Sequence, residues 1–418
     1  MNRFLKFFGF LLIMATLVSC SQSNKLNKYN TAKQYVDEFP GRMMQQQVFH
    51  VNDSLSELSI RVLPSLIPNL KSNQLEIYSY MTLTYAVYTS MNKKDVIETD
   101  SYKLSELLAF DQIQNGVAQI KIPLPLVQNS NYVILVSLQD PVNKSNYLKF
   151  LRIFKTEDAA ENYRVLDENN EISWFPWLEY GKQVRIQYRY TGAKVLHLSY
   201  IKPQFSPAKP PYSNLEQVEF SKPEIFEGFD LGLQDGLSSL IQLPKSGVYK
   251  IHAKKDDLAG KTIVQFYDDF PSVSSDAQKV FALRYLNARK EFSMMLGDDP
   301  AHTINEFWYF EDRTKERSQE MMKTYYARML RANRIFTTYK EGWKTDRGMI
   351  FMIYGPPDHV YQEQASEVWE YGPDADYNDL KFVFNIVNTP LIDKEFVLER
   401  SESYKSSWYQ LLDHWRNQ

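Results

Sequence analysis

Hydrophobic and polar residues alternate with a period of two from about residue 45 to residue 155. Between Leu75 and Val87 the odd positions are mostly apolar, while the even positions are mostly polar or aromatic. Such alternation gives a β-strand one buried side and one solvent-facing side. More short strands, separated by turn signals, are expected at Val117–Ile122, Tyr132–Leu138 and Tyr147–Phe154. Regular short strands with little helix predict an antiparallel, immunoglobulin-like β-sandwich over residues 45–155.

Residues 172–270 show the same pattern and predict a second, similar β-sandwich. The polar and acidic stretch Thr156–Ile172 is expected to link the two sandwiches. A Pro-rich segment, Gln204–Ser213, is expected to be an irregular loop. The expected strands of this domain are Gln183–Tyr190, Lys194–Ile201, Gly247–Ala253 and Thr262–Tyr267.

The pattern changes after Pro271, and residues 274–418 are expected to form an α+β domain. Apolar residues at helical spacing predict helices over Ala277–Leu296 and Thr314–Tyr339. A short final helix is expected at Ser407–Trp415. The expected strands of this domain are Met349–Tyr354, Glu367–Tyr371, Lys381–Val387 and Glu395–Ser401.

The amino terminus has the features of a secretory signal, predicted to span residues 1–19. Arg3 and Lys6 precede the apolar run Phe7–Leu17, which is shorter than the roughly 20 residues of a membrane-spanning helix. The run ends in Leu-Val-Ser-Cys, which resembles the bacterial lipobox at all four positions. We therefore expect Cys20 to be lipidated and to attach the chain to a membrane. The alternative is a buried amino-terminal helix with an incidental cysteine.

Residues 20–44 are expected to hold the lipidated Cys20 and a polar tether that keeps the folded body near the membrane. No Asp follows Cys20, which by resemblance to lipoprotein sorting favours the outer membrane. No acidic cluster of the kind found in surface-exported lipoproteins lies in Ser21–Asn30. The expected location is therefore the periplasmic face of the outer membrane.

Composition removes several classes of function. The chain of 418 residues has a formal net charge of −3, so no nucleic-acid partner is expected. Cys20 is its only cysteine, which excludes an internal disulfide, a thiolate metal site and a catalytic cysteine. Its 28 Tyr and 25 Phe favour strands and binding surfaces.

Familiar catalytic motifs are missing from the sequence. The six histidines include no His-Glu-x-x-His pair, so no metal site is expected. Nucleotide-binding glycine loops and the Gly-x-Ser-x-Gly elbow are also absent, and no cofactor is expected. A Ser/His/Asp arrangement assembled only in space stays open. The sequence therefore favours a non-enzymatic role and leaves an enzyme as the alternative.

One long motif lies in the α+β region. Gly342-Trp343-Lys344-Thr345-Asp346 is followed by Arg347, Gly348 and an apolar run, and then by Gly355-Pro356-Pro357-Asp358. This closely resembles the GWxTD domain of bacterial envelope proteins, and the likeness extends over roughly Ser274–Trp415. The resemblance implies a location in the cell envelope and a fold, with preceding β-sandwiches, but no particular reaction.

Two interpretations of the motif are possible. In the first, it forms a structural corner from helix to strand: Gly342 ends the helix in a left-handed cap, Trp343 packs beneath, and Gly348 allows the bend. Thr345 and Asp346 would bond neighbouring backbone N–H groups. In the second, a small functional site is built from Asp346, Arg347, Asp358 and His359. The structural interpretation is favoured.

A basic stripe on the second long helix also allows two interpretations. Arg328, Arg331 and Arg334 recur every three residues and could meet lipid phosphates or an acidic partner. The favoured interpretation is pairing inside the protein with acidic residues further along the chain.

Two functions are compatible with these features. The favoured one is a non-enzymatic scaffold or partner-binding subunit of an envelope protein assembly or secretion complex, held on the membrane through Cys20. The alternative is an envelope hydrolase acting on glycan or peptide with a site at the motif. A concave pocket with convergent polar groups at the motif would favour the hydrolase.

Overall fold

The structure is a computed structural model of the whole chain, and it describes most of it. The described residues are 25–36, 44–62, 80–107, 113–114, 117–141, 144–203, 205–213, 223–255, 257–309, 313–372 and 380–417. The predicted signal peptide, Cys20 and part of the predicted strand between Leu75 and Val87 lie outside these residues. No helix of the described part is long and apolar enough to cross a membrane.

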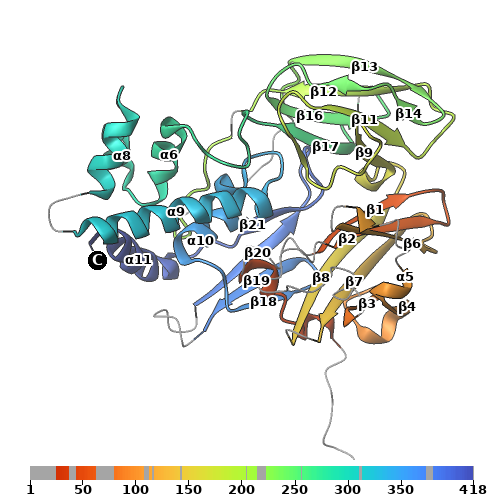
Figure 1. Ribbon diagram of the computed structural model, residues 1–418, viewed down its shortest axis with the longest axis horizontal. Coiled ribbons are helices and arrows are strands. Elements are labelled where there is room, and N and C mark those ends of the chain that lie inside the picture. The colour runs from red at the N-terminus through yellow and green to blue at the C-terminus, as the bar shows by residue number, and fades with distance from the viewer. Residues whose placement is uncertain are drawn as a thin grey trace, which may run out of the picture.

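The first β unit, residues 44–155, consists of two antiparallel four-stranded sheets packed face to face (Figure 1). One sheet has the order β1-β2-β6-β5, formed by Met44–His50, Ser56–Val62, Val117–Leu124 and Ile113–Gln114. The other has the order β4-β3-β7-β8, formed by Val96–Lys103, Thr82–Tyr88, Ser130–Asp140 and Ser145–Lys155. Alternate side chains of both sheets, such as Leu58, Ile60, Leu83 and Ile134, fill the space between them. The predicted sandwich is therefore present.

The second β unit, residues 163–265, is one continuous sheet of short strands folded around a core. Its order is β10-β17-β16-β12-β13-β14-β11-β15, with β9 paired to β11. All of its pairs are antiparallel except β10 with β17. The strands are β9 Tyr163–Asp167, β10 Trp177–Leu178, β11 Gln183–Tyr188, β12 Val195–Ile201, β13 Glu227–Gln234, β14 Leu237–Ser238, β15 Ile241–Gln242, β16 Gly247–His252 and β17 Gly260–Gln265.

Part of the expected linker belongs to this second unit. The strand β9 lies inside Thr156–Ile172 and pairs with β11 over five residues. Tyr163 and Val165 are buried in the core of the unit. The linker prediction is wrong for this strand. The strand has only five residues, and the polar and acidic residues on both sides made the whole stretch resemble a linker.

The C-terminal domain, residues 274–417, is α+β as predicted. Its antiparallel sheet has the order β18-β19-β20-β21, and its helices gather at the end of the molecule away from the two β units (Figure 1). The strands are His359–Gln362, Ser366–Tyr371, Leu380–Val387 and Glu395–Leu398. The helices are α6 Asp276–Ala282, α7 Arg289–Met295, α8 Pro300–Trp308, α9 Lys315–Phe336, α10 Asp346–Tyr354 and α11 Lys405–Asn417. The predicted fold class, two β-sandwich units followed by an α+β domain, is thus confirmed.

Two predicted elements of this domain differ from the structure. The helix expected over Ala277–Leu296 is broken into α6 and α7 by the 3₁₀ turn Leu283–Tyr285 and the residues that follow it. At the break the side chain of Asn287 donates to the carbonyl of Leu283, a local bond that competes with the helical one. The run Met349–Tyr354, expected to be a strand, is the second half of α10.

The short segment before the first β unit is folded onto the other parts. Leu26 is fully buried against the first β unit, and its N–H donates to Met91 O. The helix α2, Lys33–Val36, places Tyr35 in the core of the C-terminal domain. Thr31 N donates to Val360 O of β18 at 2.8 Å. The prediction that residues 20–44 form a tether is therefore wrong for residues 25–36.

The three parts are joined by polar bonds as well as by apolar contacts. Arg164 of the second β unit pairs with Glu57 of the first at 2.7 Å. Arg152 of the first donates to Gln362 of the C-terminal domain at 2.9 Å. The buried Lys250 of the second unit donates to Leu391 O of the C-terminal domain at 3.1 Å. The contact between Arg152 and Gln362 lies beside a space where the three parts meet.

Candidate functional site

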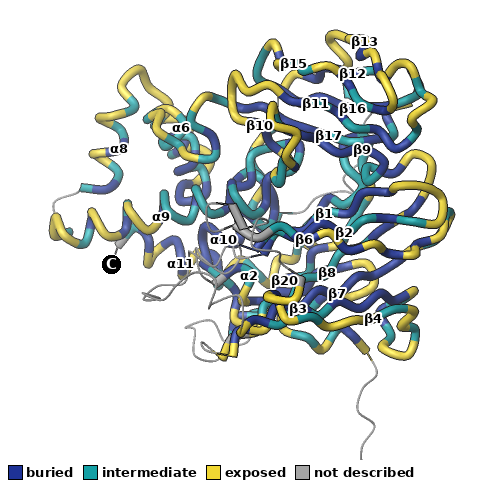
Figure 2. The backbone as a smooth tube through the Cα atoms, turned by 45° about the vertical axis from the view of Figure 1, so that its right-hand side comes forward, coloured by how far each residue is buried: buried dark blue, intermediate teal, exposed yellow. Residues whose placement is uncertain are grey.

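The motif segment, residues 342–358, forms a 3₁₀ turn followed by the buried helix α10. Gly342–Lys344 make the turn, and Thr345 caps the helix by accepting a hydrogen bond from Gly348 N at 3.0 Å. Asp346 lies in the first helical turn, where its negative charge interacts favourably with the positive end of the helix dipole. Every residue of α10 except Arg347 is buried (Figure 2). A short, wholly apolar run is compatible with either a buried helix or a buried strand. The capping residues Thr345 and Asp346 favour the helix.

Both early glycines of the segment serve close packing and not chain reversal. Gly342 is not in a left-handed cap; its Cα faces the carbonyl of Ala332 in α9. Gly348 lies inside α10 against the carbonyl of Gly342, and it makes no bend into a strand. These two predicted roles are wrong because the chain continues into a second helix: the turn at Gly342 touches the backbone of α9, and α10 at Gly348 touches the backbone of the turn.

Trp343 is the largest side chain of the segment and is 2% exposed. Its ring meets Phe281 and Tyr285 edge-on, with centroids 5.8 Å away in both cases. Its backbone carbonyl accepts a hydrogen bond from the hydroxyl of Tyr285 at 3.0 Å. Trp343 therefore ties the turn to the first helices of the domain.

Asp346 bonds a distant strand and not the neighbouring backbone that the sequence suggests. Its Oδ2 accepts from Leu398 N at 2.8 Å and from Arg400 Nη1 at 3.1 Å, while Oδ1 pairs with Arg400 Nη2 at 2.5 Å. The side chains of Asp346 and Arg400 are 11% and 9% exposed. A carboxylate so enclosed and so fully bonded holds α10 against the end of β21.

Arg347 points away from Asp346, toward the junction of the three parts. Its guanidinium lies 3.5 Å from the ring centroid of Phe396 and pairs with Glu367 at 3.3 Å. Glu367 also accepts hydrogen bonds from the hydroxyl of Tyr35 and the indole of Trp369. Burial, followed by the field of Glu367, raises the pKa of Tyr35 well above its usual range.

The end of the segment turns out of the helix, as its Gly-Pro-Pro sequence predicts. Gly355 has a positive φ of 85° at the end of α10. Asp358 is exposed and accepts a hydrogen bond from Gly372 N at 2.8 Å, and His359 is exposed at the start of β18. Pro356 and Pro357 connect the two elements. Asp346, Arg347, Asp358 and His359 thus make separate contacts and do not converge on one site.

The basic stripe of α9 is used partly inside the protein. Arg328 donates to the carbonyls of Met352 and Ile353, both at 3.0 Å, and Arg331 donates to Tyr35 O at 2.6 Å. The acceptors are backbone carbonyls, whereas the sequence suggested acidic side chains. Within the described ranges, no His, Cys, Asp and Glu side chains are grouped in a way that could hold a metal ion.

The N-cap can be tested by Thr345→Ala. Thr345 Oγ1 accepts from Gly348 N and donates to Gly342 O at 2.7 Å, so both bonds are lost and a buried N–H is left unpaired. We expect the unfolding free energy of the C-terminal domain to fall by about 1–2 kcal/mol. Five of the seven tryptophans lie after residue 274, so urea unfolding followed by tryptophan fluorescence reports on this domain. Thr303→Ala, at a half-buried position of α8 where the hydroxyl bonds only to Asp299 O, is the control and is expected to leave the transition in place.

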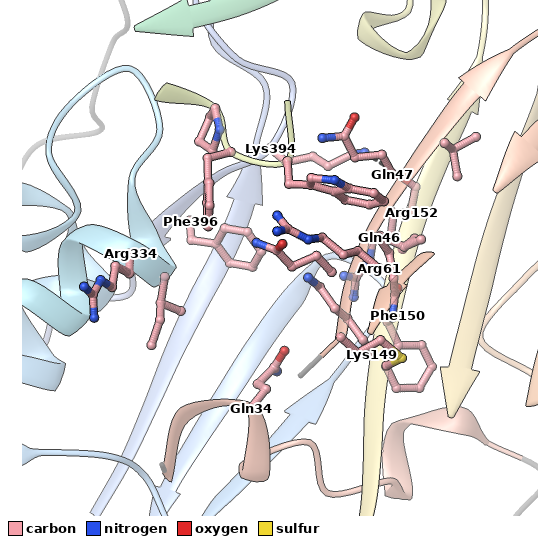
Figure 3. Close-up of a pocket in the computed structure, with 18 of the residues that line it drawn as sticks. Gln34, Gln46, Gln47, Arg61, Lys149, Phe150, Arg152, Arg334, Lys394 and Phe396 are labelled. Carbon is pink, nitrogen blue, oxygen red and sulfur yellow. Dashed lines mark hydrogen bonds between the residues drawn. The ribbon is translucent and has the colours of Figure 1, made fainter. Parts of the chain in front are cut away.

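A cavity of about 900 Å³ lies where the two β units, α2 and the C-terminal domain meet, and we call it the junction cavity. Figure 3 shows Arg61 of β2 and Lys149 and Arg152 of β8 directed into this space, with Phe396 of β21 on another wall. Aromatic rings contribute to its lining from Phe150, Trp174, Phe175 and Trp177. Its cationic lining residues are Arg61, Lys149, Arg152, Lys261, Arg331, Arg334, Arg347 and Lys394.

The junction cavity was not predicted from the sequence, although the sequence contains a signal for it. Lys149 stands in phase with Tyr147, Leu151 and Ile153, which pack against the sandwich core. Gln46 stands in the same relation to Met44 and Val48. A charged or amide side chain at a core position of a strand indicates an internal polar site.

Comparison with known proteins identifies a known domain in one part of the chain. No curated protein matches it. Two solved structures that it resembles are the C-terminal domain of the Streptococcus agalactiae AgI/II polypeptide BspA and trypsin-activated alpha-2-macroglobulin from Escherichia coli. The first has 9% identity and a TM-score of 0.18, over 54% of this chain and 100% of that one. The second has 13% identity and a TM-score of 0.19, over 53% of this chain and 15% of that one.

The sequence profile of one family matches the C-terminal part. The match covers residues 247–417, which include β16, β17, the whole helical region and the sheet β18–β21. It begins before the boundary expected at residue 274 and takes in the two strands of the second β unit that lie nearest to the C-terminal domain. With the packed helix pair α9–α10 and its Gly-Trp-Lys-Thr-Asp turn, this chain therefore contains a GWxTD domain, at residues 247–417.

Proposed function

We propose that this protein is an outer-membrane-anchored lipoprotein that acts as a non-enzymatic scaffold or partner-binding subunit of an envelope protein assembly or secretion complex. The observation that carries the proposal is the use of the GWxTD motif inside the fold. Trp343 is buried, Asp346 is bonded to Leu398 and Arg400, and Arg347 is paired with Glu367. A motif whose polar groups are spent on internal contacts supports a structural role and not a catalytic one.

The anchor is proposed from the lipobox at Cys20. The first described residue, Lys25, is five peptide units from Cys20 along the chain, and five units span at most about 18 Å. The protein body would then lie directly against the membrane surface, with the part around Met91 and Asn92, which contact Leu26 and Lys25, closest to it. The expected side is the periplasmic face of the outer membrane.

A partner surface is supported by exposed apolar side chains on the second β unit. Ile225, Phe226 and Phe229, at the start of β13, are 42%, 51% and 37% exposed. Neighbouring exposed apolar residues of this kind favour contact with another protein.

The anchoring is tested by Cys20→Ala. The substituted chain has no thiol to accept a lipid, so we expect it to take up no labelled fatty acid and to leave the membrane fraction. Metabolic labelling and membrane flotation measure both effects. Labelling and flotation of the Cys20→Ala protein at the wild-type level would contradict the anchor.

The scaffold role is tested against the alternative, an envelope hydrolase acting on glycan or peptide. Tagged wild-type protein and a Phe226→Ser, Phe229→Ser variant are crosslinked in cells and recovered from membranes. A defined partner recovered in near-equal amount with wild type and lost with the variant supports the scaffold. Cleavage of glycan or peptide by the purified protein, abolished by His359→Ala, would support the hydrolase instead.

A further inference from the structure

The charges that line the junction cavity are strongly unbalanced. Eight lining side chains are cationic, and only Glu161, Glu179 and Glu367 are acidic. Glu161 is paired with Lys394 at 3.3 Å, Glu367 is paired with Arg347 at 3.3 Å, and Glu179 is exposed. The acidic groups of the described lining are therefore already engaged or turned to solvent.

Four of the cations have no hydrogen bond or ion pair among the described residues: Arg61, Lys149, Lys261 and Arg334. Arg61 keeps a buried Nε without an acceptor. Burial lowers the pKa of Lys149, and no nearby charge of the described chain opposes that effect. Burial lowers the pKa of Lys261 as well, against the opposing field of Glu161. A surrounded cation without a counter-charge is costly in the folded protein.

The amide of Gln46 adds a neutral unsatisfied group to the same cavity. Gln46 is 8% exposed, and neither its Oε1 nor its Nε2 has a hydrogen-bond partner. Buried side-chain amides are normally bonded, so an amide left open beside a cavity indicates a missing partner. The Gln46 amide offers a neutral donor and an acceptor, whereas the cations around it can only donate.

The remaining walls are flat and aromatic. Trp177 and Phe175 stack with ring centroids 4.2 Å apart, and Phe396 faces the guanidinium of Arg347. A space of about 900 Å³ with several polar groups between aromatic walls has the size and character of a small-molecule site. It is contributed by all three parts, so an occupant would also hold them together.

From these features we infer that the junction cavity is a binding site for a polyanionic small molecule, one that carries two or more phosphate or carboxylate groups. Lys149, Lys261 and Arg61 supply the charge, and Gln46 supplies a neutral hydrogen bond. Phosphates and carboxylates are the groups that guanidinium and ammonium donors bind most strongly. The inference rests on the cavity alone and stands whether or not Cys20 carries a lipid.

The test is calorimetric titration of the purified full chain with two probes, inorganic tripolyphosphate and citrate, at fixed ionic strength. Saturable binding of one or both probes with one site per chain is expected, and the two titrations tell phosphate from carboxylate ligands. Lys149→Gln and Lys261→Gln each remove a charge at nearly constant size, and each should weaken binding by about tenfold or more. Lys121→Gln, on an exposed strand position outside the cavity, is the matched control and should bind like wild type.

Thermal unfolding separates a ligand role from a structural one. Removing an enclosed cation that makes no ion pair or hydrogen bond relieves a cost of folding, so both variants should melt at or above the wild-type temperature without probe. The inference is overturned if neither probe binds, if the Lys121→Gln control loses as much affinity as the cavity variants, or if those variants bind like wild type. It is overturned equally if they melt lower than wild type, since the two lysines would then have partners inside the protein.

Discussion

Gly342→Ala is expected to destabilise the C-terminal domain by at least about 3 kcal/mol, the upper part of the range for overpacked sites. A Cβ at this position would lie 1.9 Å from the carbonyl oxygen of Ala332 and 2.8 Å from Asn333 Cα. Both atoms belong to the backbone of α9, so no side chain can move aside to make room. Gly348→Ala is expected to act similarly, because its Cβ would lie 1.9 Å from the carbonyl oxygen of Gly342.

The matched control is Gly297→Ala, in the same domain, where an added Cβ meets nothing within 4 Å. Urea unfolding of the three full-length variants, followed by tryptophan fluorescence, gives the comparison. If the Gly342→Ala or Gly348→Ala protein is insoluble, limited proteolysis of the cell extract supplies a second readout, in which α9 and α10 should be cut early. A Gly342→Ala protein as stable as Gly297→Ala would contradict the close packing of α9, the turn and α10.

The fold class followed from the sequence because period-two alternation and helical spacing are local signals. Most of the strands that were predicted in the β units, and the helix α9, lie within a few residues of their predicted ranges. No individual range was predicted for β1, β2, β4 or β13. The strand β9 was missed because it is five residues long and sits between acidic turns. Its identity as a strand depends on pairing with β11, about twenty residues further along the chain.

The helix α10 was predicted to be a strand over Met349–Tyr354, although local signals for a helix start precede it. Thr345 and Asp346 form an N-cap with an acidic first turn, which predicts a helix start. The apolar run that follows has no polar face, because α10 is covered by α9, α11 and the strand β21. A helix buried on all sides loses the 3.6-residue periodicity that normally identifies it.

The junction cavity depends on assembly and could be inferred only in part. Its lining comes from strands of both β units, α2, α9 and β21, which are separated by hundreds of residues in the chain. A single residue such as Lys149 at a core position of its strand indicates something polar inside. Only the structure shows that Lys261 and Arg61 face the same space.

Asp346→Ala is expected to cost about 3–5 kcal/mol of the unfolding free energy, several times the roughly 1 kcal/mol that a single local hydrogen bond would contribute. The carboxylate pairs with the guanidinium of Arg400 and also accepts from Leu398 N, and both side chains are nearly enclosed. Without it, the buried guanidinium of Arg400 loses its counter-charge, the buried N–H of Leu398 loses its acceptor, and β21 is released from α10.

Removing both charges separates the pair from the packing around it. The double variant Asp346→Ala, Arg400→Met should recover part of the loss, because no guanidinium without a counter-charge is then left between α10 and β21. Asp358→Ala is the control: its carboxylate is exposed and accepts one bond, from Gly372 N, so its effect should stay below about 1 kcal/mol. Urea unfolding of the three full-length variants measures all of these differences. Asp346→Ala with wild-type stability would show that the motif aspartate is free for a substrate, and the structural interpretation of the GWxTD segment would fail.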